Sequence, residues 1–209
     1  MHEMRYSGDS FLRLENMVEI AKRRGLDGIC ITDHDSMGLK EFAADYSEKT
    51  GFPIFVGIEF YSLQGDIVAF GIEDYPKERI PAQEFVDLVQ AQGGMCFSAH
   101  PFRNNNRGLE ENLKIVKGLD GIEVLNGSTL YEANRKAAEY AAELGLATVG
   151  SSDCHVPEKL GLYATYFPRE IRSVQELIRS VKRCETLPVY YKEGGYYPVS
   201  YTHLTLPTT

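Results

Sequence analysis

The stretch GLDGICITDHDS (residues 25–36) places a short apolar run directly before a cluster of polar residues. Residues 27–33 are predicted to form a buried strand, and His34 follows at the end of it. The same order recurs along the chain, with a helical pattern after most of the apolar runs. Strands that are apolar throughout and alternate with helices predict a mainly parallel sheet that is buried on both faces.

Periodicity gives a coarse map of these elements. Helices are expected over residues 11–24, 39–49, 82–92, 109–117, 130–144 and 173–182. Strands are expected over residues 27–33, 53–59, 66–72, 94–100, 121–126, 147–153 and 163–167. No helix separates strand 66–72 from the strand before it, so we expect these two to form a hairpin.

Polar residues at the ends of the strands favour a closed arrangement over an open one. They stand at or just after the ends of five predicted strands: His34, Glu59, His100, Asn126, Asp153 and His155. In an α/β barrel such ends converge on one face, where active sites form. In an open sheet they would spread along a crevice. We therefore expect a barrel-like fold.

Length and charge exclude several classes of protein. A chain of 209 residues with 43% hydrophobic residues suits one domain. Its net charge of −8 argues against sequence-independent coating of nucleic acid. No apolar run is long enough for a membrane span. The four cysteines have no short spacing, which favours free thiols and a cytoplasmic location.

Four of the five histidines belong to the strand-end pattern or open the chain: His2, His34, His100 and His155. Imidazole nitrogen and carboxylate oxygen together form the ligand set of zinc, manganese or iron, and the lack of a thiolate motif argues against a structural zinc site. Taken singly, each histidine could be an ordinary polar residue, Asp153 could cap a turn, and Glu123 could be a surface residue.

Several motifs in order make the chain resemble one family. They are HEMRYSGDS (2–10), GLDGICITDHDS (25–36), VGIEF (56–60), GDIVAFGI (65–72), AHPF (99–102), GIEVLNG (121–127) and GSSDCH (150–155). In this order they resemble the PHP-domain (polymerase and histidinol phosphatase) family, in particular its small stand-alone members. The resemblance implies a distorted (β/α)7 TIM-like barrel and a metal-dependent phosphoesterase with two or three divalent metals, Mn, Zn or Fe.

The resemblance also implies roles for particular residues. The implied metal ligands are His2, Asp9, His34, Glu59, His100, Asp153 and His155. The proton of the attacking water would go to Asp33, Asp35 or the metal-bound Glu59. Arg103 would either contact substrate phosphate or be a solvated loop arginine. Some relatives have a histidine ligand at the position of Asp66, so Asp66 is either a ligand or an edge-strand charge.

Both ends of the chain depart from the family pattern. Met1 stands at the middle position of the family's His-x-His, so we expect that the first ligand and the first barrel strand are missing and that stability is impaired. Residues 199–209 resemble a translated sequencing adapter, which would leave His203 without a function. We therefore expect a single PHP domain over residues 1–198 and a non-native tail over residues 199–209.

The implied reaction is hydrolysis of a small phosphate ester through metal-activated water. Candidate substrates are a nucleotide 3′-phosphate, the end of a short oligonucleotide, or a compound like histidinol phosphate. No membrane association is expected, and no protein partner is predictable. Two other classes stay open: a PHP-like binding or regulatory module without a full metal site, and a metal-dependent amidohydrolase that acts on a C–N bond.

Overall fold

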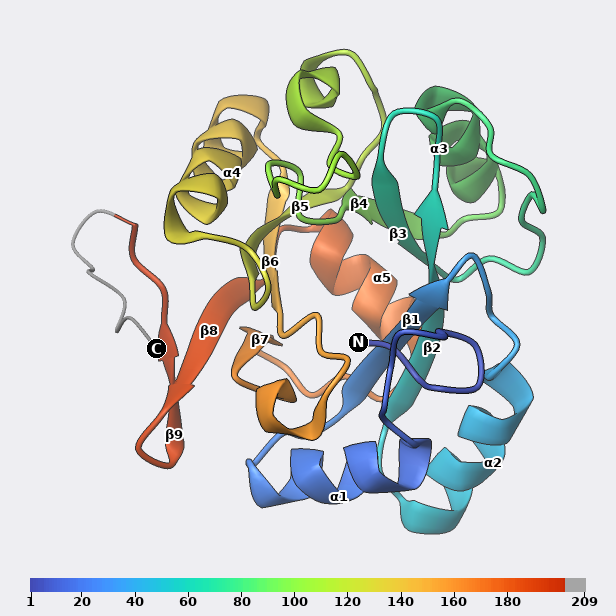
Figure 1. Cartoon of the computed structure of the whole chain (residues 1–209), viewed down its shortest axis with the longest axis vertical. Helices are drawn as coiled ribbons and strands as arrows, with labels where there is room; N and C mark the ends of the chain where they lie inside the picture. Colours follow the sequence, from blue (N-terminus) through green and yellow to red (C-terminus); the bar gives the residue numbers. More distant parts are fainter. Residues whose placement is uncertain (202–209) are drawn as a thin grey trace.

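The main sheet has six strands that curl into half a barrel. A computed structural model of the protein describes residues 1–201. In spatial order the strands are β1 (Ile29–His34), β2 (Ile54–Tyr61), β3 (Asp66–Phe70), β4 (Met95–Ser98), β5 (Gly121–Asn126) and β6 (Ala147–Ser151) (Figure 1). Only β3 runs antiparallel to its neighbours. The predicted hairpin of β2 and β3 is confirmed. The five strands other than β3 all end at the same edge of the sheet.

A second, antiparallel sheet lies beside β6. It consists of β7 (Tyr163–Tyr166), β8 (Leu187–Lys192) and β9 (Gly195–Pro198). Strand β7 agrees with the predicted strand 163–167, whereas β8 and β9 were not predicted from the sequence. Gly150 of β6 allows the close approach of this sheet, because a Cβ atom there would lie 2.6 Å from the carbonyl oxygen of Ala164. The six-stranded half-barrel and the small sheet are therefore separate sheets, and a complete seven-stranded barrel is not observed among residues 1–201.

Four helices cover the outside of the half-barrel and a fifth lies within its curve (Figure 1). The outer helices are α1 (Leu14–Arg23), α2 (Lys40–Thr50), α3 (Ala82–Ala91) and α4 (Tyr131–Leu144). The inner helix is α5 (Val174–Lys182), which begins at Ser173, whose side chain accepts a hydrogen bond from the backbone of Glu176. Leu177 and Val181 of α5 pack against strand residues of the concave face. Helix α5 therefore closes the apolar end of the half-barrel.

The alternation of side chains along each strand divides the core into two parts. On β3, Ile67 and Ala69 pack outward in the cluster shared with α3 and α4. Val68 and Phe70 point inward and pack with α5. The inward positions at the opposite edge of the sheet are polar. Apolar residues therefore fill one end of the concave face and leave its other end for a polar site.

The predicted helix over residues 109–117 is wrong. Only the short 3-10 helix η1 (Glu110–Lys114) forms there. Glu110 has a positive φ of 48°, which interrupts helical geometry at the first turn. The side chain of Asn112 bonds back to the carbonyl oxygen of Leu109, and such local bonds compete with the α-helical pattern.

The two ends of the described chain contact the sheet. The carbonyl oxygen of Met1 accepts a hydrogen bond from the backbone N–H of Thr32 on β1, and the N–H of His2 donates to Cys154 beyond β6. Tyr201 donates its hydroxyl to the carbonyl oxygen of Val124. The rest of the predicted tail, with His203, lies outside the described residues. Through residue 201, no helix has both the length and the apolar character needed to span a bilayer.

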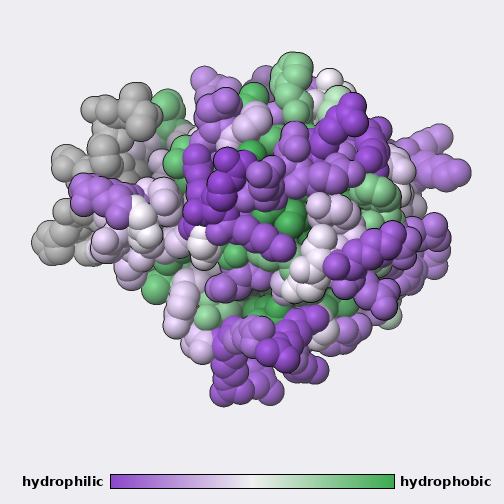
Figure 2. Space-filling view, turned by 90° about the horizontal axis from the view of Figure 1, so that it is seen from below, coloured by the Kyte–Doolittle hydropathy of each residue, from purple (hydrophilic) through white to green (hydrophobic). Residues whose placement is uncertain are grey.

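The surface agrees with this division between polar and apolar side chains. Hydrophilic side chains cover most of the face seen from below, and hydrophobic residues show between them (Figure 2). The apolar clusters are buried within the fold.

Candidate metal centre

The edge where the parallel strands end gathers the predicted ligands. The structure brings together seven side chains from the chain start, the strand ends and the loops that follow: His2, Asp9, His34, Glu59, His100, Asp153 and His155. Asp66 joins them, because antiparallel β3 begins at the edge where β2 ends. The topology therefore places every predicted ligand in one cluster.

Three histidines form a stack at one side of this cluster. The ring of His2 lies 4.3 Å from the rings of both His34 and His155. Asp9 lies over this stack, with Oδ2 at 3.4 Å from His34 Nε2 and 3.3 Å from His155 Nε2. One nitrogen from each of the three rings falls within 4.8 Å of the others, so the three rings could share a cation.

Glu59 stands at the centre of the cluster. Its carboxylate lies 2.8 Å from His34 Nδ1, 3.1 Å from His100 Nε2 and 3.6 Å from His2 Nε2. The side chain is almost fully buried. A carboxylate that touches three imidazoles from three different segments can bridge two cations.

Asp153 connects the cluster to its rim. Its Oδ1 lies 3.2 Å from His2 Nε2, and its Oδ2 accepts hydrogen bonds from Arg103 Nη1 at 2.8 Å and from Asn126 Nδ2 at 3.2 Å. Arg103 is about 30% exposed and reaches in from the loop after β4. A positive side chain therefore stands between the buried carboxylates and solvent.

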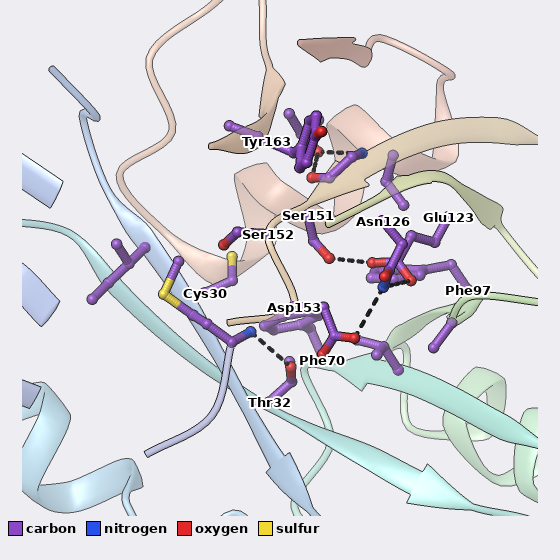
Figure 3. A pocket seen from close by; sticks show the side chains of 18 of the residues that line it. Cys30, Thr32, Phe70, Phe97, Glu123, Asn126, Ser151, Ser152, Asp153 and Tyr163 are labelled. Carbon is purple, nitrogen blue, oxygen red and sulfur yellow. Dashed lines mark hydrogen bonds between the residues drawn. The ribbon is translucent and has the colours of Figure 1, made fainter. Parts of the chain in front are cut away.

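Glu123 is a part of the site that the sequence analysis did not assign to it. It is buried, and its carboxylate accepts bonds from the backbone N–H of His100, from Asn126 Nδ2 and from the hydroxyl of Ser151. Figure 3 shows Glu123 beside Asn126 and Ser151, with Asp153 close to Asn126. The backbone that carries His100 is therefore fixed by a buried acid.

Arg107 was also missed. Its guanidinium makes a two-pronged contact with Asp66, with Nε at 2.7 Å from Oδ2 and Nη2 at 2.9 Å from Oδ1. The ring of Tyr61 lies 4.3 Å beneath it. The available signal was a second arginine four residues after Arg103 in the same loop.

Asp33 and Asp35, the predicted proton acceptors, accept hydrogen bonds from backbone groups and from Ser7. Asp33 accepts hydrogen bonds from the N–H of Glu3 at 2.6 Å and from Ser7 Oγ at 2.8 Å. It therefore holds the loop that carries His2. Asp35 is exposed, and its Oδ1 accepts the N–H of Tyr61 at 2.8 Å.

The backbone is strained where the strands end. Asp35, His100 and Asp153 have positive φ angles of 49°, 27° and 43°. Non-glycine residues rarely adopt this region, and such strain gathers at functional sites. Each of these residues follows a strand that ends at the cluster, so the chain turns sharply there, and His100 and Asp153 are buried.

Burial and close charges shift the pKa values across the cluster. Burial lowers the pKa of His2 to about 4, although the hydrogen bond to Asp153 acts in the opposite direction. Burial would also lower the pKa of His100, but its bond to Glu59 raises it to about 9. Burial opposes a charge on Glu59, yet the bond from His100 and the close imidazole of His34 hold its pKa well below the usual value. The cluster therefore keeps its central carboxylate charged.

The donor atoms fit a divalent cation. Two buried ring nitrogens, His34 Nδ1 and His155 Nε2, face carboxylate oxygens of Glu59 and Asp9 without forming a hydrogen bond. Buried nitrogens without a partner are costly unless a ligand satisfies them. A second group of donors comprises Glu59, Asp66 and His100, all buried. Nitrogen and carboxylate donors of this kind suit zinc, manganese or iron.

A cavity of about 170 Å³ opens below the cluster. His2, Glu59 and Asp153 line its polar end, and Phe70 and Met95 are among the apolar residues that line the rest. Figure 3 shows this pocket with Cys30 and Thr32 of β1 on one side and Ser151 and Tyr163 on the other. The polar end of the cavity is continuous with the candidate metal centre.

Comparisons with known proteins agree with this architecture. A family model described as PHP-associated matches residues 131–186. The uncharacterized protein MJ1587 of Methanocaldococcus jannaschii is 28% identical over 119 residues, which are 56% of this chain and 68% of that protein.

Solved structures share the fold. An amidohydrolase from Chromobacterium violaceum matches with a TM-score of 0.65 and 19% identity, over 86% of this chain and 95% of that one. The lesion-specific endonuclease Q of Pyrococcus furiosus matches with a TM-score of 0.64 and 16% identity, over 88% of this chain and 55% of that one. A protein from Bifidobacterium adolescentis, proposed to be a metal-dependent phosphoesterase, matches with a TM-score of 0.59 and 18% identity, over 88% and 94%.

The chain therefore shares its fold with these solved structures, and residues 131–186 match the PHP-associated family model.

Proposed function

We propose that this protein hydrolyses a phosphate ester with the help of bound divalent cations. The observation that carries the proposal is the combination of a buried nitrogen and carboxylate cluster with two arginines at its edge. Guanidinium groups match the geometry of phosphate oxygens, whereas the amide group itself is uncharged. The structural neighbours, which include a proposed metal-dependent phosphoesterase and an endonuclease, support a hydrolase.

The cations would be held by two overlapping sets of residues. His2, His34 and His155 offer ring nitrogens on one side, with Asp9 above them. His100 offers a nitrogen on the other side, and Glu59 lies between the two. Asp153 would complete the first set through its contact with His2.

Bound cations of this kind lower the pKa of water toward neutrality and neutralise charge on a phosphate in the transition state. The chain itself orients the substrate. Arg103 lies partly exposed above Asp153, where it can bind a phosphate oxygen from the solvent side. Asp33, Asp35 and Glu59 stay predictions as proton acceptors, and the contacts of Glu59 with three histidines suit it also to holding cations.

The proposed substrate is a small phosphorylated compound, with a nucleotide 3′-phosphate, an oligonucleotide end or a compound like histidinol phosphate as the candidates. The net charge of −8 disfavours a long polyanion, and the two arginines concentrate positive charge at the centre. We also propose that residues 1–198 act as one PHP domain of the barrel type.

The test is phosphate release from a panel of nucleotides, short oligonucleotides and sugar or amino-alcohol phosphates with added Mn²⁺. We expect activity that a chelator abolishes and that Mn²⁺ restores. The double variant His34→Ala with Glu59→Ala should be inactive, because it removes donors that both sets of ligands use.

Arg103→Met separates phosphate recognition from metal binding. It should weaken the apparent affinity for phosphate esters while the protein still hydrolyses them at high substrate concentration. Release of phosphate by the double variant at the wild-type rate would refute the proposal. Hydrolysis of amides but of no phosphate ester would instead assign the protein to amidohydrolase chemistry.

A further inference from the structure

We propose that Ser7 positions the imidazole of His2 for cation binding, with Asp33 as the support of Ser7. This inference rests on the proposed metal centre and deepens it, because it names residues that act through a candidate ligand. The side chain of Ser7 is only 1% exposed. Its hydroxyl lies between three groups: the carboxylate of Asp33, the ring of His2 and the backbone of His34.

The hydroxyl of Ser7 has one proton to donate, and Asp33 accepts it. Ser7 Oγ donates to Asp33 Oδ1 at 2.8 Å and accepts the backbone N–H of His34 at 3.3 Å. The same oxygen lies 3.5 Å from His2 Nδ1. Because a hydroxyl has a single donor, the contact with His2 is one in which Nδ1–H donates to Ser7. Ser7 therefore favours the tautomer of His2 that carries its proton on Nδ1.

This tautomer leaves Nε2 of His2 without a proton, and Nε2 is the nitrogen that faces the centre. It lies 3.2 Å from Asp153 Oδ1 and 3.6 Å from Glu59 Oε2. A histidine must be neutral at the nitrogen that binds a cation. The other N–H of a metal-bound histidine usually donates to a nearby acceptor, and loss of that acceptor lowers metal affinity by about 10–100-fold. Ser7 has the position of such an acceptor.

Asp33 and the turn around Ser7 hold the hydroxyl in place. Asp33 is buried, and its Oδ1 accepts the N–H of Glu3 at 2.6 Å as well as the hydroxyl of Ser7. The N–H of Ser7 donates to the carbonyl oxygen of Glu3 at 2.9 Å. Asp33 therefore supports His2 through Ser7 and through the backbone of Glu3.

Ser10 provides a matched control in the same loop. Its buried hydroxyl donates to the backbone carbonyl oxygen of His2 at 2.7 Å and accepts the N–H of Leu12 at 3.2 Å. Within residues 1–201 it makes no hydrogen bond with the ring of His2. Replacing Ser10 by alanine therefore weakens the loop and leaves the contact with the ring intact.

The experiment measures the affinity for Co²⁺ and the visible absorption spectrum of the Co²⁺-loaded protein, because this spectrum depends on how the ligands are arranged around the ion. Ser7→Ala should lower the affinity by about 10–100-fold and change the spectrum at saturating Co²⁺, because the ring of His2 is no longer held. Ser10→Ala should lower the affinity by less and leave the spectrum unchanged. Circular dichroism checks that each variant is folded.

Asp33→Ala tests the support of Ser7. Because the two residues act through one hydrogen bond, the double variant with Ser7→Ala should bind Co²⁺ no more weakly than the weaker single variant. Losses that multiply in the double variant would overturn the inference, and Ser7→Ala alone decides if Asp33→Ala does not fold. An unchanged affinity or spectrum in Ser7→Ala, or an equal effect of Ser10→Ala, would overturn this inference alone. A wild type that binds no divalent cation would refute the proposed metal centre itself.

Discussion

Replacing Glu123 by alanine should destabilise the metal-free protein. The substitution removes the acceptor of three hydrogen bonds, from the N–H of His100, from Asn126 Nδ2 and from Ser151 Oγ. The N–H of His100 then lacks its acceptor next to a positive φ of 27°, which leaves a strained turn without its support. Asn126 keeps its hydrogen bond to Asp153, so the loss of its bond to Glu123 costs less free energy than the loss at His100.

The size of the effect follows from these three donors. A buried donor without a partner costs about 1–3 kcal/mol, and a lost bond whose donor can find another partner costs about 0.5–1.5 kcal/mol. The sum is roughly 3 kcal/mol of unfolding free energy. For a domain of this size, that corresponds to a Tm about 6–12 °C lower.

Glu123→Gln is the matched control. Burial raises the pKa of Glu123, so its neutral form is favoured more than in water. A neutral glutamine side chain of the same shape should therefore destabilise the protein less than alanine does. One carbonyl oxygen stays as an acceptor, and we expect a loss of about 1 kcal/mol.

Thermal unfolding of both variants is measured with a chelator present, so that metal binding does not contribute to stability. The reasoning fails if the two variants have the same Tm, or if the alanine variant unfolds within about 3 °C of the wild type, because one lost kcal/mol alone would shift Tm by that much.

Three further predictions follow from contacts at the site and in the sheet. Glu59→Gln should weaken manganese binding by more than about 100-fold, because loss of even a residue that only supports a ligand lowers metal affinity by about 10–100-fold. Titration calorimetry measures the affinity, and unchanged binding would contradict the central place of Glu59. The pKa of about 9 means that His100 holds a proton at pH 7 in the metal-free protein, so cation binding should release protons and tighten as the pH rises through 9. Calorimetry in two buffers of different ionisation enthalpy counts these protons, and a count of zero at pH 7 would be inconsistent with His100 as a ligand. Gly57→Ala should lower stability by about 1–3 kcal/mol, because its Cβ would lie 2.3 Å from the carbonyl oxygen of Ala69; Gly8→Ala, which meets nothing within 4 Å, should be near neutral in the same denaturant titration.

The sequence predicted the centre because its ligands follow a simple rule. His34 ends β1, Glu59 ends the predicted strand 53–59 although β2 continues to Tyr61, and His100 comes just after β4, so one pattern of burial followed by polarity marked all three. Glu123 does not follow that rule, because it lies three residues before the end of β5. A register shift between Glu123 and Leu125 alters the pairing of β5 with β6 at that point, and such an irregularity leaves no mark in the composition.

Arg107 could not be assigned for another reason. Its partner Asp66 is forty-one residues away in the chain, and only the close approach of the loop at Gly65 brings the two together. Strands β8 and β9 were missed because they are rich in tyrosine and their buried and exposed positions alternate too irregularly to give a clear period. Local patterns found the ends of the buried strands, whereas pairings between distant segments needed the fold.

The loop after β4 bears His100, Arg103 and Arg107 within eight residues, between a strand and a 3-10 helix. One of these side chains touches Glu59, one Asp153 and one Asp66. A change of sequence in this single segment would therefore alter the charge of the centre and the side chains that contact its acidic residues, while the strands stay the same. Because loops tolerate insertions and substitutions better than strands, proteins of this architecture could differ in this loop, and therefore in the charged side chains at the centre, while they keep the same sheet.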